Sequence, residues 1–197
     1  GYDVTIFESR EKIGGVLRYG IPEFRLPKSI LDRYQKQLIK LGIKIRPNTA
    51  IGRTLTVDDL AWLKDQIGQY DLVMMQFELP MPVIETVAQW AHDAGVIVMI
   101  NPAPAAPLSD KLLACTTYIS PNEHEAAILA DHSIDVSNGI NMDDVAIVAR
   151  AFHDRGVENL IITMGENGSI VAGKDGIHHT DCVKAPQVVE PTSAGDS

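Results

Sequence analysis

The stretch of sequence that decides the fold is Val96-Ile97-Val98-Met99-Ile100-Asn101-Pro102-Ala103-Pro104. It begins as an unbroken apolar run rich in β-branched side chains and then changes abruptly to asparagine and proline. An apolar run of this length is typical of a strand that is buried on both faces of a parallel sheet. In open parallel sheets, ligands bind beyond the carboxyl ends of the strands. The stretch therefore predicts a buried strand whose polar end faces a binding site.

The same pattern recurs on both sides of this strand. Short apolar runs alternate with segments in which apolar residues repeat with the period of a helix. This order predicts an α/β fold with three layers, in which helices cover a mainly parallel, Rossmann-like sheet. The other predicted elements of this region are strands at 72–75, 118–119 and 160–162, helices at 83–91 and 145–152, and an antiparallel edge hairpin formed by 168–172 and 176–179.

Polar residues or glycines follow each predicted parallel strand. Because the carboxyl ends of parallel strands meet at one edge of the sheet, we expect these residues to converge on a single site. The candidates at the strand ends are Glu78, Asn101, Asn122, Glu125, Thr163, Gly165 and Gly168.

The final segment, Pro191–Ser197, follows one more apolar pair and combines small residues with an acid. Small side chains leave backbone N–H groups uncovered, and such groups at the start of a helix bind anions. An aspartate beside them, Asp196, is well sited to accept a proton from a hydroxyl that attacks a phosphate. The alternative is a polar helix cap, in which Ser193 or Asp196 closes the first turn.

Composition and charge limit the classes of partner. The formal net charge of the 197 residues is −9, which argues against binding to a nucleic-acid backbone but leaves room for a small-molecule nucleotide. No apolar run approaches the length of a membrane span. Cys115 and Cys182 have neither metal nor redox spacing, so we expect a reduced, cytoplasmic protein. Nothing in the sequence decides whether it forms homo-oligomers.

The first sixty residues read differently. Val4–Glu8 predicts a strand that ends in an acid, Ser29 can cap a helix over about 30–41, and 43–45 predicts a second strand. The sequence of Val4–Glu8 and of Ile13–Lys28 resembles the flavin- and NADPH-binding small subunit of glutamate synthase and related oxidoreductases. The resemblance implies FAD contact around Glu8 and the Gly14-Gly15 loop. We expect no free-standing FAD site, since the Gly-x-Gly-x-x-Gly turn that binds the pyrophosphate is missing.

From about residue 60 onward a second resemblance rests on four separated motifs that occur in order. They are Asn101-Pro102-Ala103-Pro104, Pro121-Asn122-Glu123-His124-Glu125-Ala126, Ile162-Thr163-Met164-Gly165-Glu166-Asn167-Gly168 and Ala194-Gly195-Asp196. Together they resemble ribokinase and the ribokinase-like sugar kinase superfamily. The resemblance implies ATP-dependent phosphorylation of a ribose-like sugar, with Mg²⁺ as cofactor.

The resemblance also assigns roles. Asp196 matches the catalytic base, and Ser193, Ala194 and Gly195 match the anion hole for the transferring phosphoryl group. Asn122 and Glu125 match the element that serves the ATP phosphates and, through water, Mg²⁺. Thr163, Gly165 and Gly168 match the nucleotide loop, and Glu78 matches an acid that contacts ribose hydroxyls. Glu190 and Thr192 match a segment that helps hold a monovalent cation such as K⁺, although the family has aspartate at position 190 and threonine at 191.

The residues themselves leave simpler roles open. Glu125 could belong to a capping box, and the glycines at 165 and 168 could serve only the turn before the hairpin. The histidine pair His178 and His179 is interpreted as solvated surface of an edge strand.

The two resemblances predict a chimera, with an oxidoreductase-like βαβ fragment at residues 1–60 and a ribokinase-like core at 61–197, in one continuous α/β layer. We expect a truncated kinase core, because the sugar-binding half of the family and the helix behind its anion hole are missing. Little or no turnover is therefore expected. The alternatives are a non-catalytic nucleotide-binding or structural chimera and, more weakly, a flavin-binding fragment.

Overall fold

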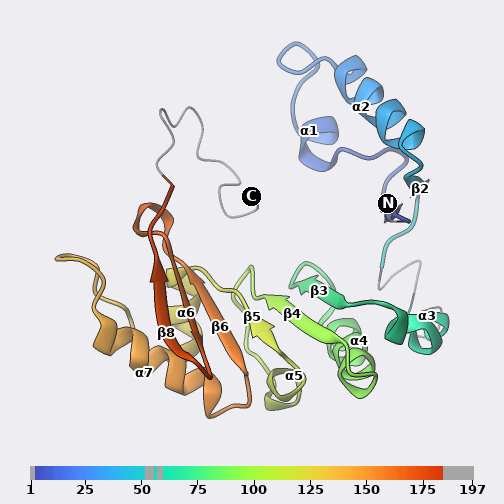
Figure 1. Ribbon diagram of the computed structural model, residues 1–197. Coiled ribbons are helices and arrows are strands. Elements are labelled where there is room, and N and C mark those ends of the chain that lie inside the picture. The colour runs from blue at the N-terminus through green and yellow to red at the C-terminus, as the bar shows by residue number, and fades with distance from the viewer. Residues whose placement is uncertain (1–2, 52–55, 57–59, 184–197) are drawn as a thin grey trace. The chain divides into compact units, whose positions relative to one another are not determined.

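A computed structural model describes residues 3–51, 56 and 60–183 (Figure 1). The chain divides into two compact units, residues 1–60 and 61–197, which are described separately.

The second unit is built on a six-stranded sheet. Its strands are β3 (Leu72–Gln76), β4 (Ile97–Asn101), β5 (Tyr118–Ile119), β6 (Asn159–Thr163), β7 (Ser169–Gly173) and β8 (Gly176–Thr180), and their order in the sheet is their order in the sequence. The pairs from β3 to β6 are parallel, whereas β7 pairs antiparallel with both β6 and β8. The mainly parallel sheet and the edge hairpin predicted from the sequence are confirmed.

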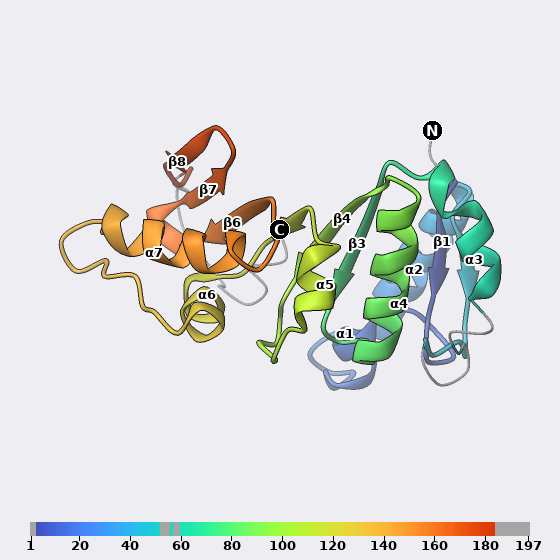
Figure 2. The ribbon, with the colours of Figure 1, turned by 90° about the horizontal axis from the view of Figure 1, so that it is seen from below.

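Helices precede the first parallel strand, β3, and connect the strands that follow it. They are α3 (Ala61–Gln66), the 3₁₀ turn η1 (Ile67–Gln69), α4 (Met81–Asp93), α5 (Asp110–Ala114), α6 (Glu123–Ala130) and α7 (Met142–His153), with a further 3₁₀ turn η2 (Gly165–Asn167) between β6 and β7. Local sequence explains where several begin: proline stands in the first turn of α4, Ser109 accepts a hydrogen bond from Leu112 N in α5, and Asn141 caps α7. Figure 2 shows α4 and α5 on the same side of β3 and β4, and α7 beside β6.

The core lies between these helices and one face of the sheet. Alternate strand residues, among them Val98, Ile100, Ile119, Leu160 and Ile162, are at most 1% exposed on this face. Side chains of α4, α5 and α7 cover them, and the side chains of that helical layer which are themselves buried include Ile84, Leu113, Val148 and Phe152.

The opposite face of the sheet is less covered than the sequence predicts. Leu72, Met74 and Ile97 alternate with the core residues and are 43%, 61% and 41% exposed. Unbroken apolar runs predict burial on both faces, but the described helices that connect these strands pack against one face only. The expectation of burial on both faces is therefore wrong for these residues within this unit.

The first unit is a small βαβ arrangement. It contains β1 (Thr5–Phe7), α1 (Gly15–Tyr19), α2 (Lys28–Lys40) and β2 (Lys44–Arg46), and its two strands pair in parallel. They form a sheet of their own, so the described strands make two sheets, where the sequence suggested one continuous layer. Each strand has only three residues, and helices α1 and α2 lie between the two strands in the sequence. Helix α2 begins at Lys28, two residues earlier than expected, with Pro27 and not Ser29 at its N-cap and no capping side chain.

Little of the first unit is buried. Among its described residues only Arg18 and Leu60 fall below one tenth exposure, and α2 buries none of its residues. Apolar side chains such as Val16, Phe24 and Leu41 remain 76%, 84% and 78% exposed. The unit has secondary structure without an apolar core.

Candidate functional site

The carboxyl edge of the sheet in the second unit gathers several of the predicted site residues. Asn122 follows β5 and Thr163 ends β6, and the two residues are joined by an isolated parallel β-bridge. The backbone N–H of Thr163 donates to the carbonyl oxygen of Pro121 at 3.1 Å, which holds the two strand ends together. Both side chains belong to exposed residues. Two motifs that lie forty residues apart in the sequence are therefore adjacent at this edge.

Asn122 and Glu125 form a complete capping box at the start of α6. Asn122 Oδ1 accepts hydrogen bonds from the N–H groups of His124 and Glu125 at 3.0 and 2.8 Å, and Glu125 Oε2 accepts from Asn122 N at 2.8 Å. The capping role that the sequence left open for Glu125 is confirmed. The box fixes both side chains at the edge of the sheet and leaves the second carboxylate oxygen of Glu125 outside this bond.

The two glycines of the predicted nucleotide loop differ in their surroundings. At Gly168 (φ 83°), an added Cβ would overlap the carbonyl oxygen of Thr180 and lie 2.8 Å from the N of Cys182. At Gly165 (φ 53°), nothing lies within 4 Å of such a Cβ. Gly168 is thus required by packing inside the protein, whereas Gly165 faces open space that a ligand could approach closely.

Glu78 lies in the turn after β3 and is exposed. This turn is tied to the end of the next strand, because Phe77 N donates to the carbonyl oxygen of Ala103 at 3.2 Å and Ala103 N donates to Asn101 Oδ1 at 3.1 Å. Glu78 and Asn101 therefore belong to the same edge as Asn122 and Thr163, as the strand register requires.

The remaining predicted residues lie outside the described part of the chain. They are Glu190, Thr192, Ser193, Ala194, Gly195 and Asp196. The base, the anion hole and the cation segment inferred from the resemblance stay predictions. In the described ranges, no group of three or more histidine, cysteine or acidic side chains could hold a metal ion.

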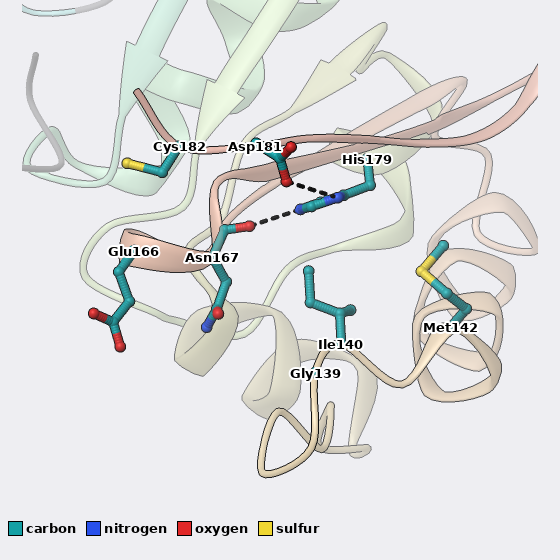
Figure 3. A pocket seen from close by; sticks show the side chains of 8 residues that line it. All are labelled: Gly139, Ile140, Met142, Glu166, Asn167, His179, Asp181 and Cys182. Atoms are coloured by element: carbon teal, nitrogen blue, oxygen red, sulfur yellow. Dashed lines mark hydrogen bonds and ion pairs between the residues drawn. The ribbon is translucent and has the colours of Figure 1, made fainter. Parts of the chain in front are cut away.

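A hollow of about 780 Å³ lies beside η2, and Figure 3 shows the side chains that line it. Glu166 and Asn167 come from η2, His179, Asp181 and Cys182 from the end of β8, and Gly139, Ile140 and Met142 from the loop before α7 and its first turn. His179 is an exposed residue, as expected from the sequence, but its contact with η2 was not predicted. Its Nε2 lies 2.7 Å from the carbonyl oxygen of Asn167, and its side chain is 33% exposed.

A cluster of acids fixes the loop that forms one wall of this hollow. Asp144 Oδ2 accepts from Asp135 N at 3.0 Å, and its Oδ1 lies 2.9 Å from His132 Nε2. The hydrogen bond from Asp135 N, and next the one from His132, hold the pKa of Asp144 below its ordinary value. Hydrogen bonds from Ser137 likewise lower the pKa of Asp135. Both groups are therefore ionised at neutral pH and act as fixed acceptors for the loop.

In the first unit, the residues that the oxidoreductase resemblance singled out serve local structure. Glu8 Oε1 accepts from Arg10 N at 2.9 Å and from Ser9 Oγ at 3.2 Å. Gly14 (φ 126°) packs against Arg18, whose Nε donates to Ile13 O at 2.7 Å and whose guanidinium pairs with Asp32 at 2.9 Å. These contacts show that Glu8, Gly14 and Arg18 serve the local structure of this unit.

Comparisons with known proteins show the family and the fold of the chain. The pfkB family carbohydrate kinases match residues 49–197, and the chain therefore belongs to that family. Ribokinase from Haemophilus influenzae is 41% identical over 137 residues, which cover 67% of this chain and 41% of that protein. The structure of Arabidopsis thaliana ribokinase complexed with ribose and ATP superposes with a TM-score of 0.62 at 24% identity, over 72% of this chain and 43% of that one. The ribokinase-like α/β fold is confirmed.

The chain spans about two fifths of the length of the Haemophilus and Schizosaccharomyces pombe ribokinases that it matches. A relative of a different kind matches a smaller part of this chain. The NAD-dependent dihydropyrimidine dehydrogenase subunit PreT of Escherichia coli O157:H7 is 52% identical over 60 residues, which are 30% of this chain and 15% of that protein. This partial match agrees with a second kind of sequence in the chain. None of the described helices has the length and apolar character needed to cross a membrane.

Proposed function

We propose that this protein is an ATP-dependent kinase of a ribose-like sugar, whose nucleotide binds at the carboxyl edge of the sheet in residues 61–197. One observation carries the proposal: the β-bridge between Asn122 and Thr163 brings two family motifs together beside the open approach to Gly165. Membership of the carbohydrate kinase family supports the reaction class.

The polar groups at this edge suit a polyphosphate. Thr163 offers a hydroxyl, Gly165 admits close approach of a phosphate to the backbone, and Asn122 and Glu125 are held rigidly by their mutual hydrogen bonds. Such positioning is what phosphoryl transfer needs, since its catalysis rests on alignment and electrostatic support. The family resemblance implies that Glu125 would meet Mg²⁺ through water, and the cap leaves one carboxylate oxygen of Glu125 for that contact. Bound Mg²⁺ would neutralise charge that develops on the phosphates.

In the proposed reaction, the sugar hydroxyl attacks the γ-phosphorus, and the bond from that phosphorus to the bridging oxygen breaks, so that ADP leaves. Asp196 takes the proton of the attacking hydroxyl. The backbone N–H groups of Ser193, Ala194 and Gly195 would stabilise the negative charge on the transferring phosphoryl group. Glu78 would hydrogen-bond ribose hydroxyls, and Glu190 and Thr192 would contact a monovalent cation such as K⁺. The reaction would take place in the cytoplasm, on small-molecule substrates.

The test is an assay of ADP formation from MgATP and ribose. Asp196→Asn should lower turnover by about 10²–10⁴-fold, the usual contribution of a general base, while the affinity for ATP changes little. Asp175→Asn, which removes an exposed acid in the turn between β7 and β8, is the matched control and should leave the rate unchanged. Wild-type turnover is expected to be low, as the sequence indicates. Turnover by Asp196→Asn at the wild-type rate would refute the role of Asp196, and no transfer by the wild type would refute catalysis and leave the second candidate below.

The second candidate is a nucleotide-binding chimera without catalysis. One observation favours it, the use of both Asn122 and Glu125 in the cap of α6. In this case MgATP would bind with an affinity that ribose does not change, and no ADP would form. An oxidoreductase-like origin of residues 1–60 belongs to this proposal and rests on the partial PreT match.

A further inference from the structure

The two neighbouring histidines of β8 have different environments. His178 Nε2 lies 3.3 Å from the carbonyl oxygen of Asp175, in its own hairpin turn. His179 lies near the open end of the hairpin, opposite Ile170 of β7, and its Nε2 lies 2.7 Å from Asn167 O in η2. Because successive side chains of a strand point to opposite faces, the pair provides one residue directed toward η2 and one directed away from it.

The His179 contact has a defined chemical sense. A backbone carbonyl can only accept, so the proton must sit on Nε2, which donates to Asn167. The Nδ1 atom on the other side of the ring lies 3.8 Å from Asp181 Oδ1. Figure 3 shows the ring between the Asp181 carboxylate and Asn167. The hydrogen bond from Nε2 to Asn167 is thus what orients the ring.

The turn that receives this bond is otherwise closed on itself. Asn167 N donates to Met164 O at 2.9 Å, Gly168 N to Gly165 O at 3.1 Å, and Met164 N to Gly168 O at 2.8 Å. The chain that leaves β8 passes directly against Gly168, as the overlap of an added Cβ with Thr180 shows. Residues 179–182 therefore hold η2 at two points, through packing on Gly168 and through the hydrogen bond to Asn167.

We propose that His179 is a positioning residue, whose Nε2–H bond to the Asn167 carbonyl fixes the Gly165–Asn167 turn in the conformation that binds nucleotide. The identity of the ligand rests on the proposed function. The fixing of the turn rests on the hydrogen bond alone. Removing the donor leaves the Asn167 peptide without this restraint, so that binding must order the turn again.

The experiment compares three variants of the full chain. His179→Phe keeps an aromatic ring without a donor, His179→Gln restores an N–H donor, and His178→Phe is the matched control on the adjacent position. Calorimetric titration with MgATP should show binding weakened about fivefold in His179→Phe, as for one lost hydrogen bond. His179→Gln should recover most of the affinity, and His178→Phe should stay within twofold of the wild type. Thermal melting identifies any variant that fails to fold.

Amide hydrogen exchange provides a readout that does not depend on nucleotide. In His179→Phe, the amides of Asn167 and Gly168 should exchange faster than in the wild type, while core amides of β6 remain unchanged. Unchanged exchange at these two amides would overturn the proposal, and so would wild-type affinity for MgATP in a folded His179→Phe. If the wild type does not bind MgATP, the proposed function fails, and exchange alone decides whether His179 positions the turn.

Discussion

The two units of this chain have similar local sequence patterns but differ in how far their apolar side chains are buried. Both contain parallel strands joined by an amphipathic helix, yet the second unit buries Phe152, Ile84 and Ile162 almost completely, while the first leaves Phe24 and Leu41 largely exposed. Secondary structure follows from local pattern, but most of the stability of a helix comes from packing its apolar face. A βαβ sequence pattern therefore does not by itself provide an apolar core.

Truncating a phenylalanine in each unit should give the largest contrast. Phe152 in α7 is 1% exposed, and Phe152→Ala should lower the free energy of unfolding by about 3–5 kcal/mol. Phe24 is 84% exposed, and Phe24→Ala should change it by less than about 0.5 kcal/mol. Urea unfolding followed by circular dichroism measures both. A loss of several kcal/mol in Phe24→Ala would show that the first unit has a core after all.

Two glycines with similar positive φ values differ in how closely they are packed. Gly168 (φ 83°) packs against Thr180 and Cys182, whereas Gly42 (φ 90°) has nothing within 4 Å of an added Cβ. Both alanine variants carry the penalty of a positive φ, about 1–3 kcal/mol. Gly168→Ala should cost about 1–3 kcal/mol more, because the hairpin must shift to avoid overlap. Equal melting temperatures for the two variants would contradict the close packing at Gly168.

The smallest expected effect concerns the ion pair between Arg18 and Asp32 in the first unit. The hydrogen bond from Arg18, and after it the nearby charge of Lys12, lower the pKa of Asp32. Because the folded pKa lies below the unfolded one, the stabilisation is complete above the unfolded pKa and is lost as the pH falls through the folded value. Amide chemical shifts of α2, followed from pH 6 into the acid range, should report this loss.

The control for that titration is Lys44→Met, which removes an exposed pair with Asp3. Surface pairs of this kind contribute little, so the shifts of α2 should titrate as in the wild type. Arg18→Met should move the transition toward the ordinary range of an aspartate. If Arg18→Met leaves the titration unchanged, the guanidinium is not what holds the carboxylate of Asp32 ionised.

The sequence predicted the elements of the second unit well, because apolar runs and helical periodicity directly record burial against a sheet. Strand β4 and the hairpin of β7 and β8 lie within one or two residues of the expected ranges. The adjacency of Asn122 and Thr163 followed from the rule that ligands gather at the carboxyl edge.

What the sequence could not provide depends on contacts between distant residues. The exposure of Met74 depends on which elements cover the second face of the sheet, and the periodicity of β3 does not record this. The role of His179 depends on its contact with Asn167 in η2, which two adjacent histidines in a sequence do not reveal. The N-cap at Pro27 shows that a serine near a helix start is only one of the available ways to begin it.

Calorimetric titration of the full chain with MgATP, with and without ribose, and separately with FAD, shows whether the second unit binds nucleotide and whether the first binds flavin. We expect saturable heat with MgATP, tighter binding when ribose is present, and no heat with FAD. Binding of FAD, or the absence of any heat with MgATP, would overturn this assignment of the two units.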